Sequence, residues 1–385
     1  MGTADREEPQ QPETQVTGRR RNGFFDGWGR WQALLVILSL YVGGVMIWEF
    51  FAEIAQRNYD PDFLALWSAG RAALGDVYKT ATLAAIQAPW THVPLPRPFP
   101  YPPTLLPFIR PFGMLPFPVA LAAWTALGFG ALLLSVRGRL RRPELIVVFM
   151  TMSVLYAAAT GQTSLLLGAA IIWAVFELPS RPYAAGAALG LVAAIKPQLV
   201  MLAPLVLLTN RRGLTGFLVA SISLVTLSVC LYGVEAWRAW IVSLEGFRAI
   251  VASTPLIARC NLSPAAALAA AGIAPILPAQ VAFGLVGVAL ALLSWRRGAP
   301  PELRIVGLVL GSFLCSPYVM PYDAAIVAPA AVMMLRGSFW PAGLLLLIPG
   351  YIPWAGAIIV AAVVAAILGR EALALRRSPW ASAMA

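Results

Sequence analysis

Residues 59–74 read YDPDFLALWSAGRAAL and place two carboxylates, Asp60 and Asp62, at the start of an apolar run. Acidic residues are scarce, because the 385 residues include only 17 Asp and Glu. The apolar side chains recur at helical spacing and predict a short helix in the plane of a membrane interface. They are Phe63, Leu64, Leu66, Trp67 and Leu74. A carboxylate pair at this place indicates chemistry or ligand binding, although Asp60 would also suit a helix cap.

The composition indicates a polytopic, all-α membrane protein. Hydrophobic residues make up 59% of the chain and charged residues 12%, about half the soluble-protein norm of roughly 25%. Apolar runs long enough to cross a membrane recur along the chain, and the absence of period-2 alternation excludes an outer-membrane barrel. The net charge of +11 lies in short clusters between these runs. This pattern follows the positive-inside bias and does not indicate a nucleic-acid partner.

Cysteine and histidine are too sparse to predict a metal site or a disulfide framework. Cys230, Cys260 and Cys315 lie far apart, with no CxxC spacing. The single histidine, His92, lies in a proline-rich loop and is expected at the surface. We therefore expect no metal and no cofactor.

The basic clusters set the predicted topology. Residues 1–30 form a disordered cytoplasmic tail that ends in three arginines, and the first span at about 31–51 leads to an outer loop at 52–103. A second outer loop, 234–272, is amphipathic. We expect one membrane-embedded domain at 31–369, a cytoplasmic tail at 370–385 and about 10–12 membrane segments. The further spans fall at about 115–136, 145–159, 164–178, 215–233, 276–295, 303–317, 324–335, 339–352 and 354–369.

Residues 186–209 are apolar but are interrupted by Lys196-Pro197. The basic flanks, Arg181 and Arg211-Arg212, both belong on the cytoplasmic side, which a single span cannot satisfy. We predict a broken helical hairpin that is bent at Lys196-Pro197 and buried among other helices, because lipid does not tolerate exposed irregular backbone.

On this topology several polar residues gather on the outer face, where ionisable groups at a membrane edge are candidates for function. They are Asp60, Asp62, Gln162, Asn261 and Asp323, with Lys196 approaching from within the membrane. Each also has a structural interpretation as a cap or a turn residue. Their convergence on one face favours a site.

Several segments together resemble glycosyltransferase family 87. They are YDPDFLALWSAGRAALG (59–75), FPYPPTLLPFIRPFGMLP (99–116), GQTSLLLGA (161–169), AAGAALGLVAAIKPQLVMLAPLVLL (184–208), NLSPAAALAA (261–270) and SPYVMPYDAAIVAPA (316–330). The resemblance covers about residues 59–335. It implies an integral-membrane enzyme of the GT-C type, similar to polyprenyl-phosphate-mannose-dependent mannosyltransferases.

The resemblance also implies residue roles. The Asp of the Asp-Phe pair is the catalytic base of the family, which maps to Asp62, with Asp60 as its rival. The family carries aromatic and His residues after the Ser-Pro element, where this chain has Tyr318, Tyr322 and Asp323 but no His. The Asn usual after Gly-Gln is replaced by Thr163 or Ser164.

Sugar transfer from a lipid phosphate needs one carboxylate, because the phosphate leaving group requires no general acid. A glycosidase needs two, because its leaving group is an alcohol. The base must reach the acceptor hydroxyl, and cations must hold the donor phosphate. The candidates for that contact are Lys196, Arg71 and Arg110. The alternatives for Lys196 are a buried ion pair or a side chain that snorkels to the interface. We interpret the DxD spacing of Asp60 and Asp62 as unrelated to metal binding.

We therefore expect an inverting glycosyltransferase that passes a hexose, with mannose as the candidate, from a polyprenyl-phosphate sugar to a lipid-linked or cell-envelope acceptor. Its site would face outward from a bacterial inner (plasma) membrane. The alternative is a transporter or flippase of a lipid-linked sugar, which would more often show inverted repeats and paired broken helices. Only one broken segment and no clear repeat are found.

Overall fold

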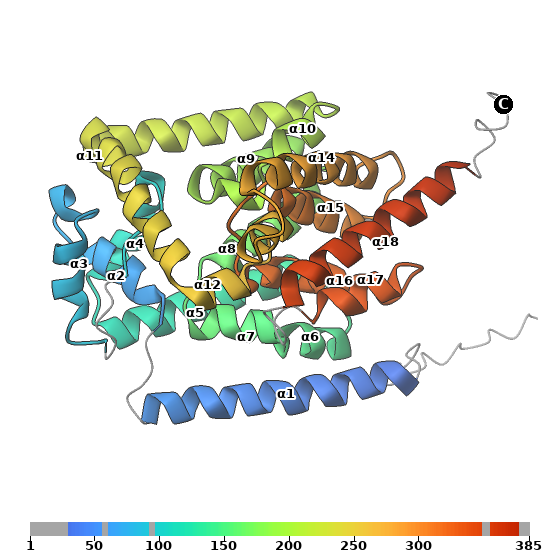
Figure 1. The fold of residues 1–385 in the computed structure, drawn as a ribbon, viewed down its shortest axis with the longest axis horizontal. Coiled ribbons are helices and arrows are strands. Elements are labelled where there is room, and N and C mark those ends of the chain that lie inside the picture. The colour runs from blue at the N-terminus through green and yellow to red at the C-terminus, as the bar shows by residue number, and fades with distance from the viewer. Residues whose placement is uncertain (1–29, 56–60, 92–96, 349–354, 377–385) are drawn as a thin grey trace, which may run out of the picture.

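The computed structural model describes residues 30–55, 61–91, 97–348 and 355–376, and within these ranges the chain is helical and has no strand. The predicted all-α class is confirmed (Figure 1). Residues 1–29 of the predicted amino-terminal tail, residues 377–385, Asp60 and His92 lie outside the described residues. The predicted carboxyl-terminal tail is corrected at its start, because residues 370–376 are the last turns of a helix. In chain order the elements are α1 (Arg30–Ala55), α2 (Phe63–Arg71), η1 (Leu74–Asp76), α3 (Thr80–Gln87), η2 (Pro103–Leu105), α4 (Leu106–Gly113), α5 (Phe117–Val136), α6 (Arg142–Phe149), α7 (Met152–Ala159), α8 (Ser164–Glu177), α9 (Pro182–Ile195), η3 (Pro197–Leu199), α10 (Ala203–Leu207), α11 (Arg211–Ser253), α12 (Pro255–Cys260), α13 (Pro264–Ala270), α14 (Ile276–Ser294), α15 (Pro301–Leu314), η4 (Pro321–Ile326), α16 (Ala328–Met334), α17 (Trp340–Leu346) and α18 (Gly356–Arg376).

Four helices in the described part of the chain are long and apolar enough to cross a membrane. The number rises to five if α6 and α7, which meet at a bend of 56°, form one broken span. The fold is therefore that of a polytopic helical membrane protein. The other predicted spans correspond to shorter helices, such as α8 and α15, or to α18, and their crossing stays a prediction. The four long spans are Ala33–Ile54, Phe117–Val136, Arg211–Val251 and Ile276–Ser294.

The predicted break at Lys196-Pro197 is present. Helix α9 ends at Ile195, Lys196 has a non-helical backbone (φ −142°, ψ 74°), and the chain continues through η3 and α10. Helices α9 and α11 then pack side by side and run in the same direction (Figure 1). A β-carbon added at Gly186 would collide with the carbonyl of Gly213, and one at Gly190 with that of Phe217. Because two successive helices can be parallel only if the chain returns between them, residues 196–210 are the returning arm of a hairpin.

Helix α2 forms where the apolar spacing predicted it, but protein covers it in place of a lipid interface. All its residues from Phe63 to Gly70 are buried. It packs against α4 so closely that a β-carbon at Gly70 would lie 2.6 Å from the carbonyl oxygen of Ile109. Leu74 lies beyond the end of α2 and is exposed. The expected position in the interface is therefore corrected: α2 is a core helix.

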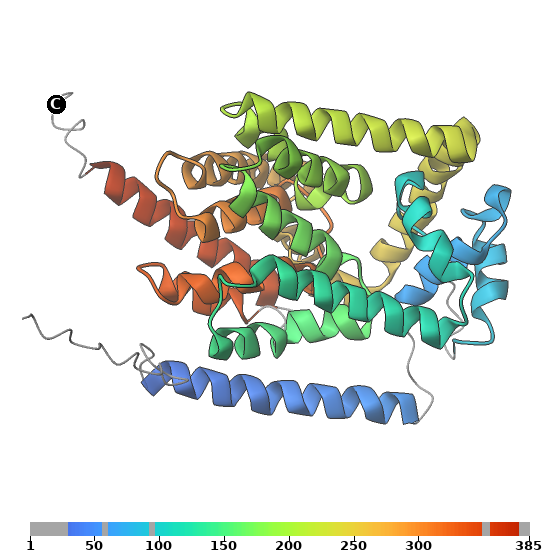
Figure 2. The same ribbon diagram turned by 180° about the vertical axis from the view of Figure 1, so that it is seen from behind.

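The second predicted outer loop begins where α11 bends. Gly233 interrupts α11 with a positive φ of 76°, which glycine adopts without a steric cost. The helix then descends past the α2–α4 region (Figure 1), and the indole N–H of Trp240 donates a 3.0 Å hydrogen bond to the carbonyl of Pro100. Its inward side, including Leu244 and Phe247, is therefore turned toward the proline-rich segment. On the other side of the molecule, α1 lies along α6 and α7 (Figure 2).

Candidate active site

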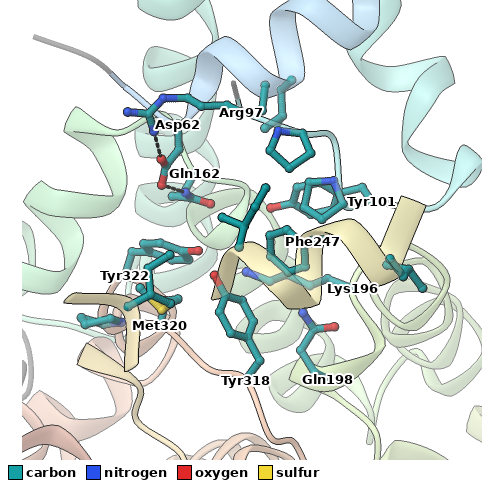
Figure 3. Close-up of a pocket in the computed structure, with 18 of the residues that line it drawn as sticks. Asp62, Arg97, Tyr101, Gln162, Lys196, Gln198, Phe247, Tyr318, Met320 and Tyr322 are labelled. Atoms are coloured by element: carbon teal, nitrogen blue, oxygen red, sulfur yellow. Dashed lines mark hydrogen bonds and ion pairs between the residues drawn. The ribbon is translucent and has the colours of Figure 1, made fainter. Parts of the chain in front are cut away.

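A pocket of about 680 Å³ lies between α2, the proline-rich segment 97–102, the α9–η3 break and the second half of α11. The segment 318–322 closes it (Figure 3). Its surface is mostly apolar, with charged side chains at two places. Asp62, Arg97 and Gln162 lie together at one end, and Lys196 lies deeper, near Gln198 and Tyr318. A pocket of this kind can accept a ligand that has both polar and apolar parts.

The Asp62 carboxylate contacts two other side chains that line the pocket. Arg97 Nη1 lies 2.5 Å from Oδ1, and Gln162 Nε2 donates a 2.6 Å hydrogen bond to Oδ2. Asp62 occupies the N-cap position of α2, but its side chain makes no capping hydrogen bond. The side chain is 37% exposed and that of Arg97 28%. The carboxylate is therefore oriented toward the pocket by side chains that are far away in sequence.

One turn between α7 and α8 holds three parts of the site through consecutive side chains. Gln162 binds Asp62, the hydroxyls of Thr163 and Tyr101 are 3.1 Å apart, and Ser164 Oγ donates to Asp323 Oδ1 at 2.6 Å. The turn is docked on α2, because the Phe63 amide donates to the carbonyl of residue 160. Residue 161, which precedes Gln162, is a glycine with φ 66°. A β-carbon at this position would lie 2.6 Å from Phe63 Cβ.

Lys196 and Asp323 form a buried ion pair. Lys196 Nζ lies 2.6 Å from Asp323 Oδ1, and the two side chains are 5% and 2% exposed. Lys196 lines the pocket, whereas Asp323 lies behind it and is not part of the lining. The ammonium group also lies 5.2 Å from the centre of the Tyr322 ring. The ion pair thus fixes Lys196 in the pocket wall, at the point where helix α9 ends.

Three of the four tyrosines that line the pocket lie outside the long apolar helices and carry neutral hydroxyl groups. Tyr101, Tyr318 and Tyr322 all line it. Burial raises the pKa of each phenol above its ordinary value. They therefore stay protonated at neutral pH and can donate hydrogen bonds to an anionic ligand.

Besides Asp323, three of the predicted ligand-binding residues do not line the pocket. The side chain of Asn261 is buried and binds backbone: it donates to the Pro317 carbonyl and accepts from the Val319 amide. Arg71 donates to the carbonyl of Gly113 and stacks on a tryptophan of α2, in a separate depression. Arg110 donates to the carbonyl of residue 72 and lies 5.8 Å from the ring of residue 232.

Other lining residues were not predicted as ligands. Arg97 is the most important, and the sequence places it only within the predicted outer loop at 52–103. A signal was available, because it is a cation in an outer loop that should carry few positive charges. Trp240 and Phe247 were recognised only as an amphipathic pattern. The remaining unpredicted residues with a polar or aromatic side chain are Tyr101, Tyr156, Gln198, Thr254 and Cys260.

The cysteines are free thiols, and only Cys260 lines the pocket. Within the described ranges no three side chains of His, Cys, Asp or Glu gather closely enough to hold a metal ion. The polar groups that line the pocket include a carboxylate, a guanidinium, an ammonium, amides, phenols, a hydroxyl and a thiol.

The fold and pocket define a polytopic helical membrane protein with an amphiphilic ligand site. The model of glycosyltransferase family 87 matches residues 99–317, more than half of the chain, and the chain therefore belongs to this family. It is a membrane glycosyltransferase. The matched range includes Gln162 and Lys196, whereas Asp62 and Arg97 precede it. No curated protein and no solved structure matches the chain.

Proposed function

We propose that this enzyme transfers a hexose, with mannose as the candidate, from a polyprenyl-phosphate sugar to a lipid-linked or cell-envelope acceptor, with inversion at the anomeric carbon. The observation that carries the proposal is the Asp62 carboxylate, which lines the pocket in a fixed orientation. A single carboxylate of this kind is the group that the chemistry requires. Asp60 stays the rival base.

In the proposed step the acceptor oxygen attacks the anomeric carbon from the face opposite the phosphate. The bond from this carbon to the phosphate oxygen breaks, and its electron pair leaves with the polyprenyl phosphate. Asp62 takes the acceptor hydroxyl proton as general base. The leaving phosphate gains negative charge, which Lys196 and the neutral phenols of Tyr318 and Tyr322 would stabilise.

The division of the pocket into apolar and polar parts supports a lipid-phosphate donor. Leu244, Phe247 and Ile250 recur along one side of α11 and line the pocket. They would contact the polyprenyl chain, while the sugar and phosphate would lie toward Asp62 and Lys196. The placement of residues 31–369 in one transferase domain, with the site on the outer face of a bacterial inner membrane, belongs to the same proposal.

A flippase or transporter of a lipid-linked sugar would use the same pocket without chemistry. The two functions differ in what they require. A transferase should transfer the sugar in detergent from a purified polyprenyl-phosphate hexose, whereas a flippase needs a sealed bilayer. The fixed carboxylate favours the transferase, because transport requires no general base.

The test compares Asp62→Asn and Asp60→Asn with the wild type in that transfer assay. Asp62→Asn keeps the size of the side chain and should slow transfer by about 10²- to 10⁴-fold, the usual cost of losing a general base. Asp60→Asn should have a much smaller effect. A dead Asp60→Asn variant beside an active Asp62→Asn variant would move the base by two residues. Full activity in both variants would favour the transporter.

A further inference from the structure

Arg97 is the cation of the pocket whose ion pair is the more accessible to a ligand. Its ion pair with Asp62 is partly solvated, with side-chain exposures of 28% and 37%. The Lys196–Asp323 pair is almost fully buried, at 5% and 2%. Separating a partly exposed ion pair costs little, whereas leaving a buried charge without its partner is strongly unfavourable. Of the two cations, Arg97 is therefore the one that an incoming anion can draw away.

The same contact conflicts with the role of Asp62 as a base. A carboxylate stabilised by a guanidinium group and an amide is a weaker proton acceptor than a carboxylate without the cation. In the ligand-free pocket Asp62 has both partners, at 2.5 Å and 2.6 Å. Removing Arg97 would take this cation away from Asp62, whereas the neutral Gln162 would still orient the carboxylate.

We propose that Arg97 exchanges partners when the donor binds: the guanidinium leaves Asp62 and binds the donor phosphate, and Asp62 becomes available as the base. This inference rests on the proposed function, since it names the phosphate contact of the same site. The exchange would take place inside the pocket, because Asp62 and Arg97 both line it. A guanidinium group matches a phosphate in geometry as well as in charge, since its N–H groups can bind two oxygens at once.

The exchange would couple chemistry to donor binding. Before the donor arrives, the carboxylate is neutralised, and no unpaired charge faces an apolar pocket. During transfer the phosphate changes from a diester with one negative charge to a monoester that gains a second charge. Arg97 would then bind the leaving group more strongly than the substrate, which is the condition for transition-state stabilisation.

Binding of farnesyl phosphate tests the exchange without requiring transfer. This probe carries the phosphate monoester on a short isoprenoid chain, and farnesol is the control that lacks the phosphate. Affinities of the purified protein are measured by calorimetry in a fixed detergent concentration. Arg97→Gln should weaken farnesyl phosphate binding by about tenfold to a hundredfold, the usual value of a charge-assisted contact, and leave farnesol binding unchanged. Arg97→Lys should recover part of the loss.

The matched control is Arg71→Gln, because Arg71 lies outside this pocket and should affect neither ligand. Unchanged farnesol binding also shows that the Arg97 variant is folded. If Arg97→Gln weakens both ligands equally, or neither, the phosphate contact is refuted.

The exchange itself is tested by Asp62→Asn. Removing the competing carboxylate should tighten farnesyl phosphate binding, and the gain should be several-fold larger with Arg97 present than in the Arg97→Gln background. Equal gains in both backgrounds would indicate only relief of charge repulsion and would overturn the exchange. These outcomes are independent of turnover. Binding that follows the expected pattern in a protein without transferase activity would refute the proposed function alone, and normal transfer with Arg97-independent binding would refute the exchange alone.

Discussion

Gln162 donates a 2.6 Å hydrogen bond to the carboxylate of Asp62, a residue 100 positions earlier in the chain. The amide is buried, and it belongs to a turn whose neighbouring residues hold Tyr101 and Asp323. One short turn therefore determines the relative positions of a carboxylate, a phenol and the partner of Lys196. The geometry of the site depends on this turn more than on the local sequence around Asp62.

Gln162→Met should lower kcat by about tenfold with a smaller change in KM. Methionine keeps the length of the side chain but removes the N–H donor, so the charged Asp62 carboxylate loses a hydrogen bond. A hydrogen bond to a charged group contributes about 1.5–3 kcal/mol. Part of this loss would raise the activation free energy of transfer. The measurement is steady-state transfer from a polyprenyl-phosphate hexose. Gln280→Met is the control, because Gln280 binds the carbonyl of Leu314 and does not line the pocket. Equal losses in both variants would indicate general destabilisation.

Breaking the buried Lys196–Asp323 pair should destabilise the protein. Lys196→Gln and Asp323→Asn should each cost about 3–5 kcal/mol, because each leaves an uncompensated charge, and the double variant should cost less than the sum. Unfolding of the purified protein in detergent measures this effect. The control is Glu235→Gln, which removes an ion pair that is 71% and 79% exposed on its two sides and should have no measurable effect. An additive double variant would show that the pair is not coupled.

The sequence predicted the fold where the signals are local. Apolar length predicted the long spans, because a span must match the thickness of the hydrocarbon core. The conflict between the basic flanks, Arg181 and Arg211-Arg212, predicted the hairpin, because basic residues favour the cytoplasmic side. The interfacial position of α2 was wrong for a related reason. A short apolar helix has the same pattern whether lipid or protein covers it, and only the close approach of Gly70 to α4 distinguishes the two cases.

The candidate site was predictable in part, because the rarity of acidic residues drew attention to Asp62 and the break to Lys196. The sequence pattern does not reveal whether a polar side chain binds a ligand or another part of the protein. Asn261, Arg71 and Arg110 are polar residues at plausible places, but their side chains bind backbone carbonyls. Arg97 forms its contact with a residue 35 positions away, which the local pattern does not reveal. Its charge in an outer loop was the one signal that the sequence offered.

The hairpin requires small residues where α9 and α11 meet. Gly186→Ala should prevent their close packing, because the added β-carbon would collide with the carbonyl of Gly213. Overpacking of this kind typically costs about 1–3 kcal/mol, and more where backbone must move. Gly130→Ala in α5 is the control, since a β-carbon there meets open space, and alanine is favoured over glycine inside a helix. The measurement is again unfolding in detergent. Equal stability of the two variants would contradict the close contact.

The orientation of the pocket can be tested by the accessibility of its two ends. Helix α5 has 20 residues and is about 30 Å long at 1.5 Å per residue, so it separates the region of Ala88 and Arg97 from that of Arg139. In a background without native cysteines, Ala88→Cys should react with an impermeant maleimide in intact cells, and Arg139→Cys only after permeabilisation. Reporters fused after Pro182 and after Arg212 should lie on the same side as Arg139, because α9 and α11 are parallel. Reaction of Arg139→Cys in intact cells, with Ala88→Cys protected, would place Asp62 on the cytoplasmic face. The donor and acceptor would then have to be available there, and the proposed transfer on the outer face would be excluded.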